Sequence, residues 1–279
     1  MSREGDGTTH YGRGGLLARL EAALREDGVD PARPTIKALA HYDQFHGRGL
    51  EATAELAGLM RAGPADHLLD IGSGIGGPAR YFADRFGCRV TGIDLTPEFC
   101  EMARHLTRLL DLGDRVAFEC GDALAMPFAD ASFDGAYSMN VSMNIADKGR
   151  FYSEIHRVLK PGAWLVLSEL AQGAGGAVDY PTPWAADASA SFLATAEETC
   201  RSLRDAGFDV IELHDSVAQA LEFGARSRAM VARGEKPPHR AVMLIHGEIA
   251  KQAMANTARG LAQNKIVPIE VLARKTSRA

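Results

Sequence analysis

The chain has 279 residues, of which 46% are hydrophobic and 24% charged, a composition typical of a soluble globular protein. A net charge of −5 without long lysine or arginine runs argues against nucleic-acid binding, and no apolar run approaches the roughly 20 residues of a membrane span. The 4 cysteines lack zinc-ligand spacing and the 9 histidines do not cluster, so we predict reduced thiols, no metal and a cytoplasmic location.

The first 65 residues predict a polar tail followed by a helical lid. Residues 1–15 are polar and glycine-rich without the apolar core of a signal peptide, so we expect a frayed tail. Apolar residues at helical spacing predict helices over 16–26 and 49–61. The aromatic and polar connector between them contains Tyr42 and His46. We expect this connector to cover a bound ligand.

From residue 66 onward, predicted strands alternate with predicted helices. This alternation indicates an α/β fold with a parallel sheet covered by helices on both faces. The strands are expected at 67–71, 89–93, 115–119, 133–138 and 163–169, and the helices at 77–86, 97–111 and 148–159.

The remainder predicts a loop followed by further helices and strands. Segments 173–193 and 216–262 exceed a minimal α/β domain, and their apolar side chains could cover a large acceptor or form a homodimer surface. His239 and His246 are predicted to be solvated. Because Pro268 lacks a ladder donor, we place the final strand near an edge or a bulge. The expected elements are helices 195–206, 216–233 and 239–262 and strands 208–213 and 266–272.

The glycine-rich turn after the first predicted strand is the most informative motif. Gly72, Gly74 and Gly77 match G-x-G-x-x-G, in which glycine permits positive φ and close approach of a ligand. Dinucleotide-binding enzymes share this pattern. Asp70, however, precedes the turn, where its carboxylate would repel a pyrophosphate and attract a cationic amino group. We therefore expect a nucleotide that carries an amino acid rather than NAD.

Two further acids follow neighbouring predicted strands. Asp94 ends the second strand, where a carboxylate can accept two hydrogen bonds from a ribose diol. Asp122 follows the third strand and can accept from an adenine amino group, while the Ala123 N–H can donate to the ring.

Together these motifs resemble the class I S-adenosylmethionine-dependent methyltransferases. The resemblance covers about 66–170 and includes segments 121–128, 133–134 and 158–162. It implies a Rossmann-like, seven-stranded, mostly parallel sheet with an antiparallel last strand, in a domain over 66–279 behind a lid over 1–65. It also implies S-adenosyl-L-methionine as cofactor and S-adenosyl-L-homocysteine as product. The cofactor-binding residues would be Asp70, Gly72, Ser73, Gly74, Asp94, Leu95, Asp122, Ala123 and Asn140.

A narrower resemblance links segments 43–53, 140–148 and 183–185 to the sarcosine/dimethylglycine N-methyltransferase-like branch. That branch acts on small amines, which implies a small-molecule acceptor methylated at an amine nitrogen. The alternative is a C- or O-methyltransferase of a secondary metabolite or lipid-like molecule. We hypothesise that the acceptor pocket is shaped by Tyr42, His46, Asn140, Asn144 and Trp184, with His46 or Tyr42 as a candidate base.

Methyl transfer from a sulfonium mainly requires alignment at about 3–3.5 Å and exclusion of water, so no nucleophilic residue is needed. Residues 139–142 do not form the N-P-P-Y-like tetrapeptide of nucleobase-methylating enzymes. Asp147 stands alone where a metal-dependent O-methyltransferase would have paired acids. An NAD-dependent oxidoreductase and a non-catalytic cofactor-binding protein remain as alternatives from other classes.

Overall fold

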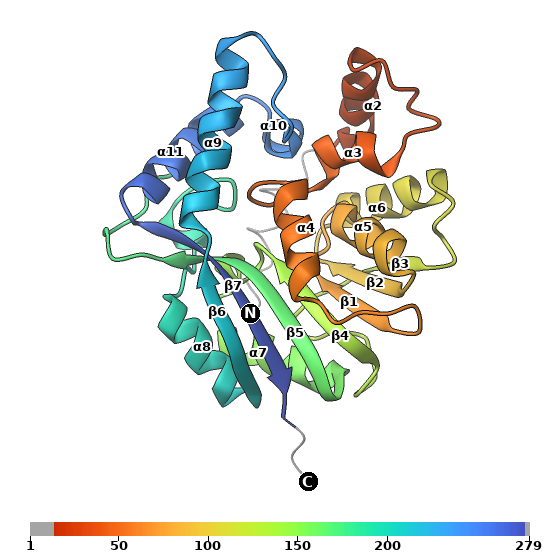
Figure 1. The fold of residues 1–279 in the computed structure, drawn as a ribbon, viewed down its shortest axis with the longest axis vertical. Helices are drawn as coiled ribbons and strands as arrows, with labels where there is room; N and C mark the ends of the chain where they lie inside the picture. The colour runs from red at the N-terminus through yellow and green to blue at the C-terminus, as the bar shows by residue number, and fades with distance from the viewer. Residues whose placement is uncertain (1–13, 277–279) are drawn as a thin grey trace.

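The computed structural model describes residues 14–276, and these residues form one seven-stranded sheet (Figure 1). The strands lie in the order β3-β2-β1-β4-β5-β7-β6. Strand β7 is antiparallel to both its neighbours, whereas the other pairs are parallel. This arrangement confirms the predicted Rossmann-like sheet. The strands are β1 (His67–Ile71), β2 (Arg89–Asp94), β3 (Val116–Cys120), β4 (Phe133–Met139), β5 (Leu159–Gln172), β6 (Phe208–Asp215) and β7 (Ile266–Lys275).

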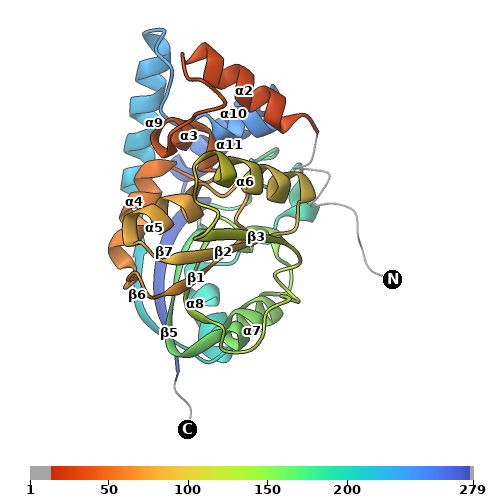
Figure 2. The same cartoon turned by 90° about the vertical axis from the view of Figure 1, so that its right-hand side faces the viewer.

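Helices cover both faces of the sheet because its central strands are apolar on both sides (Figure 2). Successive strand residues point to opposite faces. Leu68 therefore packs with α4 and α5, whereas Leu69 packs with α7 and α8. Burial of each such side chain contributes about 1.5–3 kcal/mol to stability. These helices are α4 (Leu50–Leu59), α5 (Gly77–Phe86), α7 (Lys148–Val158) and α8 (Ala196–Asp205), and α6 (Pro97–Leu109) packs on β2 and β3.

The N-terminal lid helices and the C-terminal cap helices gather at one end of the molecule, at the top of Figure 1. Leu20 of α2 and Ile245 of α10 belong to one buried cluster, and the Arg240 N–H donates to the His41 carbonyl at 2.7 Å. The predicted lid and the predicted cap thus contact each other. Their helices are α2 (Leu16–Glu26), α3 (Ile36–Asp43), α9 (Val217–Ala232), α10 (Ala241–His246) and α11 (Ile249–Ala262).

The structure differs from the sequence-based elements in two places. Residues 36–43, partly assigned to a connector, form α3, whose N-terminus is capped by the Thr35 hydroxyl. The predicted helix over 239–262 is divided at Gly247, which has φ of 60°. Strand β7 lies next to the edge strand β6, which agrees with the prediction of a strand near an edge. Pro268 is tolerated there because β6 ends opposite Ile269, before it reaches the proline.

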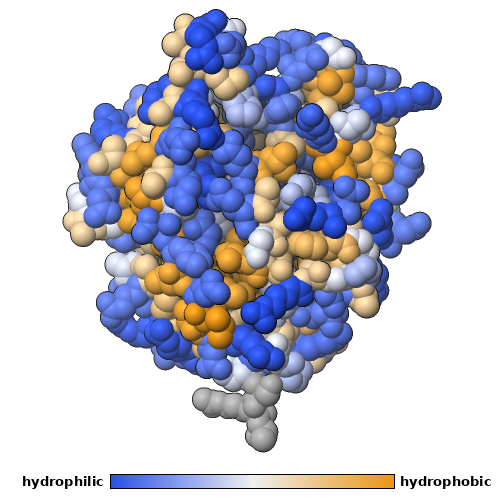
Figure 3. Space-filling view, in the orientation of Figure 1, coloured by the Kyte–Doolittle hydropathy of each residue, from blue (hydrophilic) through white to orange (hydrophobic). Residues whose placement is uncertain are grey.

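The face drawn in Figure 3 is mainly hydrophilic with scattered apolar patches. Ile211 and Leu213 of the edge strand β6 are 54% and 44% exposed. Within residues 14–276, no helix has the length and apolarity to span a membrane. The homodimer remains a prediction. The predicted frayed tail lies outside the described residues except for Gly14 and Gly15.

Candidate active site

The glycine-rich turn that follows β1 leaves open space on one side. Gly72 and Gly74 have φ of 70° and 52°, a region that disfavours side chains. A Cβ at Gly72 would lie 2.3 Å from Val141 Cγ2, whereas a Cβ at Gly74 would meet no atom within 4 Å. The Gly72 N–H donates to the Ile93 carbonyl at 2.8 Å and ties the turn to β2. Gly72 is therefore required for packing, and Gly74 faces space that a ligand could fill.

Asp70 at the end of β1 is buried beside this turn. Its Oδ2 and the Ser73 hydroxyl have no hydrogen-bond partner among the described residues. Burial raises the pKa of Asp70 to about 7, while the nearby Tyr137 hydroxyl favours the ionised form. A buried carboxylate oxygen without a partner is unfavourable unless a ligand pairs with it. These two groups fit a ligand with a cationic amino group.

Asp94 at the end of β2 fixes the shape of the turn. Its Oδ2 accepts from the Gly74 N–H at 2.8 Å, and its Oδ1 accepts from the Thr96 N–H at 2.9 Å. Each carboxylate oxygen retains a further lone pair for a ligand hydroxyl. Leu95, the next residue, is 53% exposed. An apolar side chain so exposed at this edge could pack on a bound ring.

Asp122 follows β3 at the same edge of the sheet. Strand residue Cys120 pairs in register with Asp94, which places the start of the next loop beside the end of β2. The Asp122 side chain is exposed, and its Oδ1 accepts from the Leu124 N–H at 2.8 Å. This bond shapes a turn around Ala123 and leaves the second carboxylate oxygen available.

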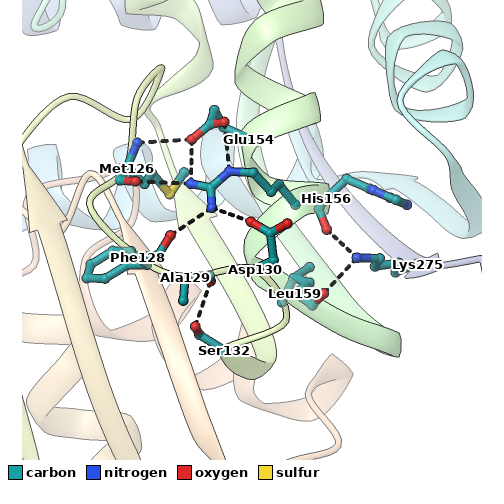
Figure 4. A network of polar contacts seen from close by, with 10 residues as sticks. Met126, Phe128, Ala129, Asp130, Ser132, Glu154, His156, Leu159 and Lys275 are labelled. Carbon is teal, nitrogen blue, oxygen red and sulfur yellow. Dashed lines mark hydrogen bonds and ion pairs between the residues drawn. The ribbon is translucent and has the colours of Figure 1, made fainter.

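A polar network on α7 holds the loop beyond Asp122 (Figure 4). Arg157 donates to the carbonyls of Met126 and Phe128 at 3.0 and 2.7 Å. Glu154 accepts from the Met126 N–H at 3.0 Å and pairs with the same arginine at 2.9 Å. The loop that contains the predicted adenine-binding residues is thus held at its C-terminal end by side chains of α7.

A cavity of about 900 Å³ adjoins the ends of β4, β5 and β7. Residues of the sheet edge, the lid and the cap all contribute to its wall. The polar wall residues include Asn140, Glu169, Glu270, His46, Arg48 and His239. The larger apolar set includes Phe45, Met143, Leu170, Trp184, Leu221, Phe223, Val231, Val242, Met254 and Leu261. The cavity therefore suits a mainly apolar ligand with a few polar groups.

Asn140 stands at the border between the glycine turn and this cavity. It follows β4 with φ of 56°, and its backbone N–H donates to the Ser168 carbonyl at 2.8 Å. With its amide turned to match its neighbours, Nδ2 donates to the same carbonyl at 3.3 Å and the oxygen accepts from the Gly47 N–H at 3.1 Å. The adjacent Val141 contacts Gly72. Asn140 therefore connects the sheet edge with the lid.

His46 and Trp184 also line the cavity. Both ring nitrogens of His46 are engaged, Nδ1 with the Gly47 carbonyl at 3.1 Å and Nε2 with the Thr53 hydroxyl at 3.0 Å. Burial lowers the pKa of His46 to about 3. Because both nitrogens are engaged, neither is available to a ligand, so this geometry does not support the predicted base role. The buried Trp184 donates from Nε1 to the Ser191 hydroxyl at 2.9 Å, so it both anchors its loop and forms part of the wall.

Tyr42 and Asn144 are not among the described residues that line the cavity. The buried Tyr42 hydroxyl donates to Asp27 at 2.7 Å and accepts from Arg240 at 2.9 Å, because α3 packs between α2 and the start of α10. Asn144 donates from Nδ2 to the Val141 carbonyl at 3.4 Å. The structure therefore groups His46, Asn140 and Trp184 at the cavity, and places Tyr42 and Asn144 elsewhere.

The prediction of solvated side chains was wrong for His246, and His239 is only partly exposed. His246 is 1% exposed. His239 lines the cavity, and its Nε2 lies 2.9 Å from the Gln44 carbonyl oxygen. Both lie where the cap folds back on the lid, a contact that the local sequence does not reveal.

The cavity wall includes charged residues that sequence reasoning missed. Glu169 accepts from the Ser142 N–H and hydroxyl at 3.0 and 2.9 Å. Arg48 pairs with Glu55 at 2.6 Å and with Glu270 at 3.4 Å. An acid within the apolar run of β5 was a signal for Glu169, because charges in buried strands need partners. No group of three or more candidate metal ligands occurs within 14–276.

Comparison with known proteins adds to this geometry. Residues 69–167 match the family model of the methyltransferase domain. The chain is 30% identical over 226 residues to the O-methyltransferase cnsE of Penicillium expansum, which covers 69% of this chain and 79% of that protein. It is 42% identical over 114 residues to 24-methylenesterol C-methyltransferase 2 of Oryza sativa subsp. japonica. This match covers 41% of this chain and 31% of the rice enzyme.

The fold is also similar to solved structures. Geranyl diphosphate C-methyltransferase from Streptomyces coelicolor A3(2) superposes with a TM-score of 0.64 at 20% identity, over 81% of this chain and 77% of that chain. The chain spans 31% of the length of the rice relative. It belongs to the S-adenosylmethionine-dependent methyltransferases. The cofactor of this family is S-adenosyl-L-methionine, and the unpartnered Asp70 and Ser73 beside the open space at Gly74 fit its amino-acid part.

Proposed function

We propose that this protein transfers the methyl group of S-adenosyl-L-methionine to a medium-sized, largely apolar small molecule. One observation supports this acceptor class, the cavity of about 900 Å³ with its mainly apolar wall. Ligand pockets of roughly 300–1,000 Å³ are typical for small molecules. Burial of apolar surface at about 25 cal/mol per Å² would provide most of the acceptor's binding free energy.

The cofactor, when bound, supplies a methyl group activated by a positive sulfur. Asp70 and Ser73 would hold its amino-acid part, and Asp94 would accept from the ribose. Asp122, Ala123 and the exposed Leu95 would contact the adenine. Asn140 lies where this site meets the cavity and would orient the two ligands toward each other.

N-methylation of sarcosine or dimethylglycine, the acceptor suggested by the narrower resemblance, is less well supported. Such acceptors carry a carboxylate and would need an available cation. Arg48 lines the cavity but is already paired with Glu55 and Glu270, which leaves Arg228 of α9, an exposed side chain, as the other arginine of the wall. The remaining acid of the wall, Glu169, already accepts hydrogen bonds from Ser138, Val141 and Ser142. The cavity is also much larger than a methylated glycine requires.

An acceptor screen with methyl-labelled cofactor, read by mass, tests the proposal. One panel contains hydroxylated polycyclic aromatics and alkylated phenols, and the matched panel contains sarcosine, dimethylglycine and other small amines. We expect label in products of the first panel. Label in the amine panel alone would overturn the acceptor class, and tight cofactor binding without turnover in either panel would favour a non-catalytic role.

A further inference from the structure

The side chain of His239 is held in one orientation in the cavity wall. Its Nε2 lies 2.9 Å from the Gln44 carbonyl oxygen. A carbonyl can only accept, so Nε2 carries the hydrogen and Nδ1 carries a lone pair. The ring packs on Gly49, where a Cβ would lie 3.0 Å from His239 Cδ2. The described residues provide Nδ1 with no hydrogen-bond partner.

The segment that holds His239 also contacts the site of methyl transfer. Gln44 and Gly49 contact the histidine, and Gly47 between them donates its N–H to Asn140. His239 is close enough to His46 for a charge on one to disfavour a charge on the other. His239 therefore lies on the lid side of the cavity, one short segment away from the border residue Asn140.

The imidazole of His239 is neutral at physiological pH. Burial lowers the pKa of His239 to about 4, and the hydrogen bond to Gln44 opposes this only in part. Its lone pair is therefore available over the whole neutral range. His46 differs in this respect, because both of its ring nitrogens are engaged.

We propose that Nδ1 of His239 accepts the hydroxyl proton of an acidic phenol or enol on the apolar acceptor, so that methylation occurs on oxygen. This inference rests on the proposed function. The hydroxyl oxygen forms the new bond to the methyl carbon, and the carbon–sulfur bond breaks with its electron pair left on sulfur. The proton moves to Nδ1 and is later released to water. The hydroxyl becomes far more acidic as its oxygen gains the methyl group, so a neutral imidazole can take the proton in the same step, most readily from a phenol or an enol.

A matched pair of variants separates the two nitrogens of His239. In His239→Gln the amide nitrogen can still donate to the Gln44 carbonyl, but the acceptor at Nδ1 is lost. In His239→Asn the amide oxygen replaces Nδ1, but the donor at Nε2 is lost. The probes are 1-naphthol and 1-methoxynaphthalene, titrated calorimetrically into protein saturated with S-adenosyl-L-homocysteine. The methyl ether lacks the O–H that Nδ1 would accept.

We expect the wild type to bind naphthol roughly tenfold more tightly than its methyl ether, as a single hydrogen bond allows. His239→Gln should abolish this preference, and His239→Asn should retain part of it. With a phenolic acceptor from the screen, His239→Gln should lower kcat by roughly 10²-fold or more and change KM little. Unchanged affinity for S-adenosyl-L-homocysteine in both variants would show that the cofactor site is intact.

The outcomes separate the two claims. A naphthol preference and kcat that survive in His239→Gln overturn the role of His239 and leave the proposed acceptor class intact. A second result would also overturn the role of His239 and leave the acceptor class intact. In that result apolar acceptors are methylated on carbon or nitrogen, and naphthol and its ether bind equally well. Failure of both naphthalene probes to bind, together with label only on small amines, overturns the proposed function itself.

Discussion

Asp43 and Arg80 form a buried ion pair that joins the lid to the cofactor-binding part of the fold. Arg80 Nη2 lies 2.9 Å from Asp43 Oδ2, and the two side chains are 0% and 2% exposed. The same nitrogen donates to the Ile75 carbonyl within the glycine turn at 2.8 Å. One guanidinium thus positions both the end of α3 and the turn after β1.

Removal of one partner should therefore destabilise the protein strongly. Asp43→Ala leaves the Arg80 charge buried without its carboxylate, which costs about 3–5 kcal/mol in comparable cases. Denaturant unfolding monitored by circular dichroism measures the loss. The matched control is Glu197→Gln, which breaks the exposed pair with Arg201 and should change stability by less than about 0.5 kcal/mol. Equal, small losses in both variants would show that the buried pair does not contribute as argued.

The raised pKa of Asp70 predicts proton release on cofactor binding. The carboxyl has a pKa of about 7 in the free protein, and pairing with an ammonium group requires its ionised form. Binding below pH 7 must therefore displace a proton, and S-adenosyl-L-homocysteine should bind about tenfold more weakly at pH 6 than at pH 8. Calorimetry at pH 6 in buffers of different ionisation enthalpy measures the released proton.

Asp70→Asn should weaken S-adenosyl-L-homocysteine roughly 10- to 100-fold and flatten this pH dependence, because a charge-assisted bond is lost. Methylthioadenosine lacks the amino-acid part and serves as the control ligand. Its affinity should be the same in wild type and variant. An equal loss for both ligands would place Asp70 at a different part of the cofactor.

The central part of the fold was predictable because its signals are local. Leu68 and Leu69 stand in a short apolar strand that runs directly into glycines, and this order specifies a strand, a turn and a helix without distant information. Asp70 and Asp94 could be placed at the ends of their strands for the same reason, and their role in cofactor binding stays a prediction. The register of these strands then brings the two acids to one edge.

The acceptor side was not predictable because its residues meet over long sequence separations. His239 and Gln44 are 195 positions apart, and the polar segment around His239 resembles a solvated turn. Tyr42 was assigned to the acceptor pocket on its local aromatic context, but its hydroxyl pairs with Asp27 and Arg240. Only the packing of the cap on the lid decides which of these side chains reaches the cavity.

Gly72 and Gly74 should respond differently to alanine. Both have positive φ, so each substitution costs about 1–2 kcal/mol of backbone strain. Gly72→Ala also forces a methyl group against Val141, an overpacking that adds about 1–3 kcal/mol. Gly74→Ala meets no atom and should mainly obstruct the cofactor. Thermal unfolding and S-adenosyl-L-homocysteine affinity, measured on both variants, separate packing from binding.

The double variant Gly72→Ala/Val141→Ala provides the control for this pair. It should recover part of the stability that Gly72→Ala loses, because the clash is removed while the strain remains. The opposite ranking, with Gly74→Ala less stable than Gly72→Ala, would contradict the assignment of Gly72 to packing.

His46 should make the folded state sensitive to acid. Its pKa is lowered to about 3 by burial, against 6.5 for an ordinary histidine, so the folded protein holds it neutral. Between these two values the unfolded chain binds more protons than the folded one, and stability therefore falls as the pH falls. The titration of His46 alone lowers the free energy of unfolding by about 2–3 kcal/mol between pH 7.5 and pH 4.5.

His46→Gln cannot titrate and isolates this contribution. Perturbed groups that do not interact with His46, such as Asp70, are common to both proteins, so they cancel when the variant is compared with wild type at each pH. Denaturant unfolding at pH 7.5, 6, 5 and 4.5 measures the difference. We expect the difference in unfolding free energy between wild type and His46→Gln to narrow or reverse toward pH 4.5. Only the wild type loses the stability that depends on a neutral His46. A constant gap over the series would mean that the pKa of His46 is the same in the folded and unfolded protein, which would contradict the lowering of this pKa by burial.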